Sequence, residues 1–233
     1  MVPTYNEKEN IKTLIDKILK LKIKSLHIVI VDDNSPDGTW KIIKEISRKN
    51  KNVHLFLRTK DKGRGAAGRD GFVYCLKHGA SIVIEMDADL SHNPKYIPVM
   101  IQELKNADLV LGSRRVKGSK ELGRSFIRRF ITYLANLYIR LILGLKVKDC
   151  NSGFRCFKRE VLEKINCKKL QSKGPAIVQE ILFKAHLKGF KIKEVPITFV
   201  DRIKGKSKLG IPQLATGYLM VLKLKVLSLM GRI

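Results

Sequence analysis

Short apolar runs alternate with amphipathic stretches along the first half of the chain. Each run has the length and composition of a buried strand, and a polar or glycine-rich turn follows it. In the amphipathic stretches, apolar residues recur every three or four positions, which is typical of helices packed on one face. The alternation predicts an α/β fold with a mostly parallel central sheet and helices on both faces. The expected strands are 25–31, 53–57, 81–86 and 108–111.

The first strand of this pattern is unusually short. Only Met1 and Val2 precede Pro3 and the turn at 4–7, whereas a strand normally has about five or six residues. A central strand this short would leave unpaired backbone groups on its neighbours. We therefore expect the natural protein to carry a short apolar extension before Met1, which an upstream stop codon or polar stretch would exclude.

The second half of the chain has a different pattern. A basic loop at 112–120 leads into a helix at 126–142 that is apolar but interrupted by arginines. The arginines argue against a membrane span and leave two readings, a helix lying in a membrane interface or an amphipathic helix packed on the domain. The last segment, 210–233, is apolar around Lys223 and Lys225. Because central lysines are costly in hydrocarbon, we interpret it as an amphipathic helix on a membrane surface.

Positive charge changes this picture, because it is concentrated in the second half. The formal net charge is +26. Residues 1–110 have 19 Lys and Arg against 14 Asp and Glu, whereas residues 111–233 have 28 against 7. Such an excess indicates an anionic partner, which could be nucleic acid, an anionic membrane surface or a phosphorylated substrate. A generally lysine-rich surface is the simpler reading, but it accounts less well for clustered arginines.

Cysteines and the N-terminal residues narrow the class of protein. Cys75, Cys150, Cys156 and Cys167 form no C-x-x-C pair, so neither a zinc site nor a disulfide framework is indicated. Residues 1–10 lack the apolar core of a signal peptide. The sequence therefore predicts reduced cytosolic thiols in one domain over 1–209, whose length suits a full hydrophobic core.

Two carboxylates follow the apolar run at 81–86. Strand alternation sends Asp87 and Asp89 to one side and the small Ala88 to the other. Ligands bind at the carboxyl ends of strands in open α/β sheets. A carboxylate pair there suits Mg²⁺ or Mn²⁺, which complete their shell with water and substrate phosphate. Asp-x-Asp is also common in solvated turns and helix caps, and that reading stays open.

Several motifs together resemble those of a known family. They are Val-Pro-Thr-Tyr-Asn-Glu at 2–7, Val-Asp-Asp-Asn-Ser-Pro-Asp-Gly-Thr at 31–39, Met-Asp-Ala-Asp-Leu-Ser-His at 86–92, Ser-Gly-Phe-Arg at 152–155 and Asp-Arg-x-x-Gly-x-Ser-Lys at 201–208. Over about residues 2–209 the chain resembles the dolichyl-phosphate (polyprenyl-phosphate) mannosyltransferases of glycosyltransferase family 2. The resemblance implies a GT-A, Rossmann-like fold with a nucleotide-binding half at 1–110 and an acceptor half at 111–209.

The resemblance also implies site residues. Asp87 and Asp89 would hold the metal on the donor diphosphate, with Ser91 where some relatives have a further ligand. Arg115, Arg128 and Arg202 would grip the lipid phosphate, and Arg114, Arg124 and Arg129 are near enough to share that role. The residues implied for the nucleotide sugar are Pro3, Tyr5, Glu7, Asp32, Asp33, Lys62 and Gly65.

The implied reaction moves mannose from GDP-mannose to dolichyl or another polyprenyl phosphate with inversion, for protein or lipid glycosylation. The acceptor oxygen is already ionised near neutral pH, so it needs no activated side chain. A UDP-sugar donor of glucose or N-acetylglucosamine is the alternative. A nucleic-acid-binding protein is the non-enzyme alternative, but aromatic residues are only 7% and the carboxylate pair would repel a polyanion, so we expect no nucleic acid.

Two other classes of protein conflict with particular residues of the sequence. A sugar nucleotidyltransferase would need a glycine-rich loop where Pro3 to Asn6 stand, and a membrane-surface scaffold would leave the carboxylates unexplained. Members of the resembling family often continue into transmembrane helices or rely on a partner subunit. We expect a peripheral enzyme at the cytoplasmic face of a membrane, with an anionic lipid surface and a membrane-anchoring subunit as partners.

Overall fold

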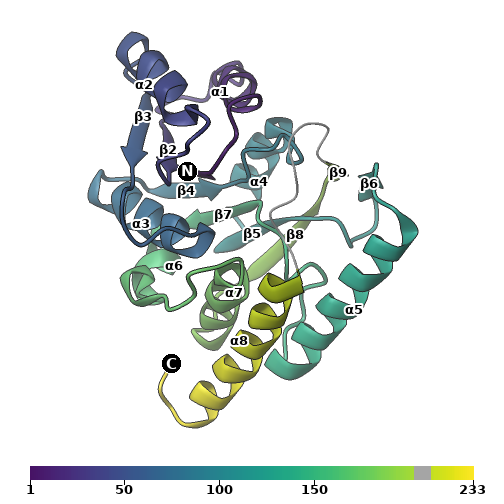
Figure 1. Cartoon of the computed structure of the whole chain (residues 1–233). Coiled ribbons are helices and arrows are strands. Elements are labelled where there is room, and N and C mark those ends of the chain that lie inside the picture. Colours follow the sequence, from purple (N-terminus) through teal and green to yellow (C-terminus); the bar gives the residue numbers. More distant parts are fainter. Residues whose placement is uncertain (202–210) are drawn as a thin grey trace.

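Two β-sheets that meet at Met1 form the centre of the molecule (Figure 1). The computed structural model describes residues 1–201 and 211–233. Its strands are β1 Val2–Thr4, β2 Ile28–Asp32, β3 Val53–Leu57, β4 Ile82–Glu85, β5 Leu109–Ser113, β6 Lys120–Leu122, β7 Arg155–Lys158, β8 Ile192–Pro196 and β9 Thr198–Val200. Its helices are α1 Ile11–Leu19, α2 Thr39–Lys49, α3 Arg64–Lys77, α4 Ile97–Glu103, α5 Phe126–Leu143, α6 Arg159–Lys164, α7 Ile177–Leu187 and α8 Ile211–Leu229, with short 3₁₀ turns η1 Pro94–Tyr96 and η2 Cys167–Lys169.

The first sheet has the order β1-β2-β3 and is parallel throughout. The second has the order β4-β7-β5-β8, and β6 and β9 form a separate parallel pair. Hydrogen bonds join the two larger sheets at β1. The amino group of Met1 donates to the Ile84 carbonyl (2.7 Å), and the Met86 amide donates to the Met1 carbonyl (3.4 Å). The extension expected before Met1 stays a prediction.

Most strand pairs are parallel, which confirms the predicted α/β class. The exception is β7, which runs antiparallel between β4 and β5. This strand follows the turn at 149–154, where the local pattern did not distinguish a strand from a helix. Its insertion brings Gly153 beside the carboxyl end of β4.

Side chains of alternate strand residues divide the apolar core into two layers. Val29 and Val31 of β2 pack into the layer that includes residues of α3, α5, α6, α7 and α8. Ile28 and Ile30, on the other side of the same strand, pack with residues of α1, α2 and α4. This separation follows from the two-residue period of a strand, and it places helices on both faces as predicted.

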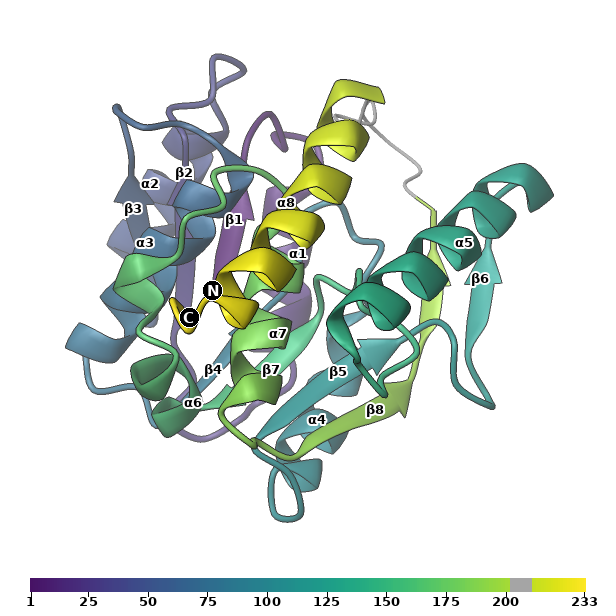
Figure 2. The ribbon, with the colours of Figure 1, turned by 90° about the horizontal axis from the view of Figure 1, so that it is seen from below.

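Helices α5 and α8 lie side by side on the outside of the first layer (Figure 2). Helix α5 buries Asn136, Ile139 and Leu143 and leaves most of its other apolar side chains exposed. One face of this helix therefore packs on the domain as predicted, and the membrane-interface reading of its exposed face stays a prediction. In the described part of the chain, no helix is long and apolar enough to cross a membrane.

Candidate active site

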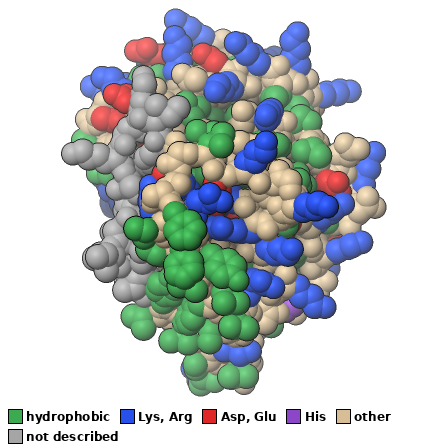
Figure 3. All heavy atoms as spheres, turned by 90° about the vertical axis from the view of Figure 1, so that its right-hand side faces the viewer, with side chains coloured by type: hydrophobic (Ala, Val, Ile, Leu, Met, Phe, Trp, Pro, Cys, Tyr) green, Lys and Arg blue, Asp and Glu red, His purple; other side chains and the backbone are tan. Residues whose placement is uncertain are grey.

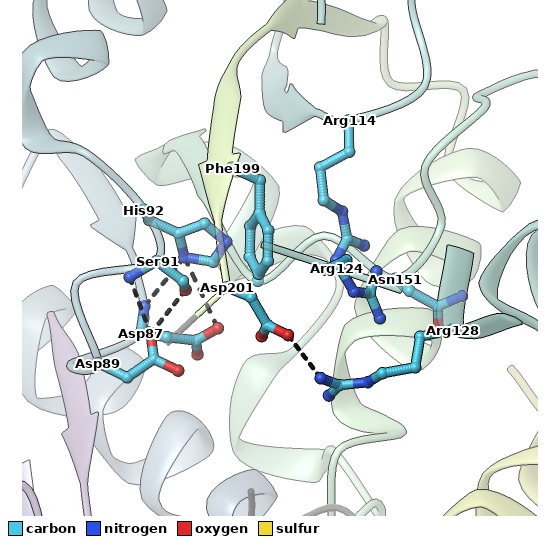
Figure 4. Close-up of a pocket in the computed structure, with 11 residues that line it drawn as sticks. Asp87, Asp89, Ser91, His92, Arg114, Arg124, Arg128, Asn151, Phe199 and Asp201 are labelled. Carbon is cyan, nitrogen blue, oxygen red and sulfur yellow. Dashed lines mark hydrogen bonds and ion pairs between the residues drawn. The ribbon is translucent and has the colours of Figure 1, made fainter. Parts of the chain in front are cut away.

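A cavity of about 730 Å³ extends from the carboxyl end of β1 to helices α5 and α8. A smaller cavity of about 160 Å³ shares Asp87, Asp89, Arg114, Arg124 and Asn151 with it. The predicted strand end is therefore a real hollow in the molecule. Side chains far apart in the sequence converge there from α5, β9 and several loops, including the loops that follow β4 and β5 (Figure 4).

Asp87 and Asp89 line both cavities, while Ala88 is buried between them. The two carboxylates share a side as predicted, but Ala88 also lines the larger cavity, because residues 86–90 lie beyond the end of β4 and do not continue its alternation. The Ser91 hydroxyl donates to Asp89 Oδ1 at 2.6 Å, and the Ser91 amide donates to the same oxygen at 3.1 Å. Ser91, predicted as a third metal ligand, thus orients the Asp89 carboxylate in this structure.

Asp87 is surrounded by groups that favour its ionised form. Its Oδ1 lies 3.3 Å from Arg64 Nη2, and its Oδ2 lies 3.6 Å from His92 Nδ1. Burial opposes ionisation, but His92 and Arg64 outweigh it and lower the pKa of Asp87. A Cβ atom at residue 153 would lie 2.9 Å from Asp87 Oδ2, so only glycine leaves room for the carboxylate.

The donor set fits a divalent cation that is shared with a substrate. The described residues contain no group of three or more His, Cys, Asp and Glu side chains placed to hold a metal ion. Two aspartates alone suit Mg²⁺ or Mn²⁺, because these ions take one or two carboxylates and complete their shell with water and phosphate oxygens. A closed structural metal site would need more protein ligands.

Residues predicted for the nucleotide sugar lie at the β1 end of the larger cavity. Pro3, Tyr5, Glu7, Asp33 and Lys62 line it. The Gly63 amide donates to Asp33 Oδ2 at 2.7 Å, and Arg58 pairs with Asp33 Oδ1. Burial raises the pKa of Asp33 despite these partners.

Asp32 and Gly65 are not among the residues that line either cavity. Asp32 is fully buried, and its carboxylate accepts hydrogen bonds from Thr4 Oγ1 (2.9 Å) and from the Ser35 amide (2.8 Å). Asp32, the last residue of β2, therefore has a structural role and holds the turn that contains Asp33. A Cβ atom on Gly65 would lie 2.1 Å from the Ser172 carbonyl oxygen, so this glycine allows the first turn of α3 to pack on the loop at 171–176.

Three arginines face the carboxylates across the smaller cavity: Arg114, Arg124 and Arg128 (Figure 4). Arg114 is held by the buried Asp149, with Nη2–Oδ1 and Nε–Oδ2 distances of 2.7 and 2.8 Å. The Phe199 ring lies beneath the guanidinium groups of Arg114 and Arg124.

Of the two other predicted arginines, the structure describes only Arg115. Arg115 is not a lining residue of either cavity, and its Nη2 lies 3.1 Å from Glu121 Oε1 and donates to the Arg129 carbonyl. Arg202 lies outside the residues that the structure describes. The resemblance implied Arg115, whereas the arginine that lines the cavities is its neighbour Arg114.

Sequence reasoning missed three site residues, Asn151, Gln179 and Arg64, all of which line the larger cavity. Asn151 stands directly before the Ser-Gly-Phe-Arg motif, which was a signal for it. Gln179 lies in α7 among apolar residues, where periodicity gives no sign of a cavity.

Glu180, the next residue, is fully buried. Its carboxylate accepts hydrogen bonds from the amides of Gln171 (3.0 Å) and Ser172 (2.8 Å) and from Lys184 Nζ (2.8 Å). It thereby fixes the loop at 171–176, which forms part of the cavity wall.

Known proteins resemble the chain both in sequence and in fold. The chain is 36% identical over 210 residues to an undecaprenyl-phosphate mannosyltransferase of Micrococcus luteus, covering 90% of this chain and 86% of the relative. It is 38% identical over 212 residues to a polyprenol monophosphomannose synthase of Mycolicibacterium smegmatis, covering 90% and 80%.

Solved structures show the same fold at lower identity. A glucosyl-3-phosphoglycerate synthase of Mycobacterium tuberculosis, in complex with Mn²⁺, UDP and phosphoglyceric acid, superposes with a TM-score of 0.66 at 20% identity, covering 97% of this chain and 76% of that one. The family model described as Glycosyl transferase family 2 matches residues 1–166. With carboxylates at the predicted strand end and these relatives over most of its length, the chain belongs to glycosyl transferase family 2.

Proposed function

We propose that this protein transfers mannose from GDP-mannose to a polyprenyl phosphate, such as dolichyl phosphate, with inversion at the anomeric carbon. One observation carries the proposal. Asp87 and Asp89 face Arg114, Arg124 and Arg128 across a cavity that continues between α5 and α8. Such a site suits two anionic substrates, one of which has an apolar chain. The names of the two bacterial relatives, both enzymes of polyprenyl phosphate mannose transfer, support the same substrates.

Donor binding is assigned to the strand-end side of the cavity. Pro3, Tyr5, Glu7, Asp33 and Lys62 would surround the nucleotide, and Asp87 and Asp89 would hold Mg²⁺ or Mn²⁺ against the diphosphate. When bound, such an ion neutralises the charge that grows on the departing nucleoside diphosphate. A structural neighbour of the same fold was solved in complex with Mn²⁺ and UDP, which supports a divalent ion as the cofactor.

Acceptor binding is assigned to the arginine side. Arg114, Arg124 and Arg128 would orient the lipid phosphate, because guanidinium groups bond two phosphate oxygens at once. Arg114 replaces Arg115 in this role, and Arg202 remains a candidate outside the described residues. An oxygen of the phosphate forms a bond to the anomeric carbon while the bond from that carbon to the donor diphosphate breaks. Placement of the two reactants in line is the main task of the protein.

The apolar end of the cavity suits the isoprenoid chain. Ile131, Ala135 and Ile139 of α5 and Val221 of α8 line it, together with Tyr218. A lipid entering here would place its phosphate towards Arg124 and its tail along the two helices. The protein would then act at a membrane surface without crossing it.

The outer face of α5 and α8 supports membrane docking. Phe126 and Leu141 are 79% and 72% exposed on α5, and Leu229 is 76% exposed at the end of α8. Figure 3 shows hydrophobic side chains gathered on this face, with Lys and Arg around them. Apolar side chains ringed by basic ones are typical of proteins that bind anionic lipid surfaces. We propose a peripheral location at the cytoplasmic face, which buried free thiols at all four cysteines suit.

A transfer assay tests the proposal directly. The protein would be supplied with polyprenyl phosphate in anionic vesicles, Mg²⁺ or Mn²⁺, and labelled GDP-mannose, UDP-glucose or UDP-N-acetylglucosamine in turn. We expect label in the organic phase from GDP-mannose, with GDP as the other product. Transfer from a UDP-sugar alone would correct the donor. Pyrophosphate release, or salt-sensitive nucleic-acid binding without any transfer, would overturn the proposal.

A further inference from the structure

Three side-chain amides form a chain of hydrogen bonds that ends in the larger cavity. Asn136 on α5 lies 3% exposed, Asn151 lies beside the carboxylates, and Gln179 on α7 is 7% exposed. Asn151 Nδ2 donates to Asn136 Oδ1 at 3.3 Å, and Gln179 Nε2 donates to Asn151 Oδ1. We call these three residues the amide relay. None of them was assigned a role by the sequence motifs.

The backbone fixes the direction of the amide relay. The Cys150 amide donates to Asn136 Oδ1 at 2.7 Å, and Asn136 Nδ2 donates to the Thr132 carbonyl at 2.9 Å. Turning the Asn136 amide over would place donor against donor and acceptor against acceptor. With Asn136 fixed, Asn151 must present its NH₂ group to Asn136 and its oxygen to Gln179.

Gln179 must therefore direct its NH₂ group to Asn151, and its Oε1 remains for another partner. In the described part of the chain, Oε1 is buried and accepts no hydrogen bond. A buried acceptor without a donor costs about 1–3 kcal/mol. This oxygen belongs to a residue that lines the cavity, and a ligand group that donates a hydrogen bond would satisfy it.

The chemistry of the proposed substrates identifies that group. A polyprenyl phosphate is mostly dianionic near neutral pH and presents acceptor oxygens, which an amide oxygen repels. The donor diphosphate is likewise an acceptor. Between the two phosphate-binding regions, the hexose is the part of the substrates that carries hydroxyl donors.

We infer that the amide relay recognises the donor sugar, and that Gln179 Oε1 accepts a hydrogen bond from one hydroxyl of the donor hexose. This inference rests on the proposed function and names how the same site recognises its sugar. A site built to accept a hydroxyl discriminates strongly against a sugar that lacks it, because the buried oxygen is then left without a donor. Gln179 is therefore a specificity-determining residue.

The experiment combines a variant with substrate analogues. Wild type and Gln179→Met would be assayed with the active donor sugar nucleotide and with its deoxy analogues, each lacking one hydroxyl, and polyprenyl phosphate. For one analogue we expect wild type to lose about 10- to 100-fold in kcat/KM, the size expected for a buried oxygen left without a donor. With the complete sugar, kcat/KM of Gln179→Met should be lower than that of wild type by a similar factor. Changing from the complete sugar to that analogue should lower kcat/KM of Gln179→Met no further.

Controls separate this role from a structural one. Binding of the nucleoside diphosphate should be unchanged in Gln179→Met, since the proposed function assigns the nucleotide to Pro3, Tyr5 and Asp33. Gln102→Met, on the exposed side of α4, should behave as wild type with every analogue. Gln179→Leu provides a second acceptor-free variant, and thermal unfolding identifies any variant that fails to fold.

Two outcomes would overturn the inference, and they are distinguishable. For every analogue, the fold losses in kcat/KM from Gln179→Met and from the missing hydroxyl could multiply. In that case the amide relay does not recognise the sugar, although the transferase assignment stands. If wild type transfers no sugar from any donor to polyprenyl phosphate, the proposed function and the inference fall together.

Discussion

The strand side and the helix side of the site differ in how far their charged and apolar side chains are exposed. On the strand side, charged side chains are paired inside the protein, as with Arg58, whose side chain is 3% exposed beside Asp33. On the helix side, Arg128 pairs with Asp201 at 2.5 Å but stays 50% exposed, and Phe126 is 79% exposed. The strand side thus keeps its supporting charges buried, whereas the helix side has exposed charge and apolar surface that a partner can cover. The comparison teaches that donor recognition is built into the fold and acceptor recognition into its surface.

The largest expected effect lies on the strand side. Asp89→Ala should reduce transfer by at least about 10³-fold, because it removes one of two carboxylates available to a divalent ion. The measurement is label transferred to the organic phase at saturating Mn²⁺. Asp16→Ala, on the exposed side of α1, serves as the control and should retain wild-type activity. If Asp89→Ala kept activity within tenfold of wild type, the proposed role of the carboxylates in the reaction would be contradicted.

The helix side is tested by removing exposed aromatic surface. Phe126 and Phe130 stack with their ring centroids 6.4 Å apart on α5. Replacing both by serine should weaken binding to anionic vesicles by about 100-fold, since each ring contributes apolar area to the membrane contact. Vesicle co-sedimentation measures the partition.

Leu57→Ser, at the exposed end of β3, is the matched control and should leave vesicle binding unchanged. Equal losses of vesicle binding in the double variant and in Leu57→Ser would show that α5 is not a specific membrane contact. In detergent, where no bilayer is needed, the double variant should retain its donor affinity.

Glu180 tests the wall between the two sides. Burial raises the pKa of this carboxyl group, but hydrogen bonds from Lys184 and from the Gln171 amide outweigh it, so its pKa lies below the ordinary value. Glu180→Gln should therefore lower the free energy of unfolding by about 1–3 kcal/mol at neutral pH. Urea unfolding measures the difference.

The pH dependence of this difference has a definite sign. A carboxyl group with a lowered pKa in the folded state stabilises the protein above its unfolded pKa, about 4.3, and the stabilisation is lost as pH falls below that value. The gap between wild type and Glu180→Gln should thus narrow on acidification from neutral pH. Glu160→Gln, exposed at the start of α6, should show little difference. A gap that widened on acidification would exclude this account of Glu180.

The smallest effect concerns adjacent arginines on the helix side. Arg128→Ala should raise KM for polyprenyl phosphate about tenfold, the size expected for one charge-assisted hydrogen bond. Arg129 is equally exposed, at 52%, but approaches Glu121 instead of lining a cavity. Arg129→Ala should therefore have little effect on KM, and the two variants should bind GDP alike. Matching acceptor defects would show that net charge, rather than position, governs acceptor binding.

The same contrast explains what the sequence could predict. Strand alternation placed Asp87 and Asp89 on one side, because their positions depend on local backbone geometry, and the family motif at 31–39 indicated Asp33. The choice between Arg114 and Arg115 depends on Asp149, which lies in a distant loop and holds Arg114. No local pattern contains that contact.

Long-range packing also decided the elements that sequence reasoning left undefined. The antiparallel insertion of β7 depends on its pairing with β4 and β5, which a turn and a short apolar run do not specify. Gln179 resembles an ordinary polar residue in a buried helix until α5 and the loop at 149–154 surround it. Residues that act through tertiary contacts were therefore the ones missed.

Glu180 grips the loop at 171–176 through main-chain amides, and every amino acid except proline has such an amide. The exposed side chain at 171 can consequently be exchanged while the path of the loop past the glycines at 63 and 65 stays the same. Residues 173–176 of the same loop line the cavity, so among descendants of this protein, and in directed evolution, new substrate preferences can arise there while Glu180 keeps the scaffold in place.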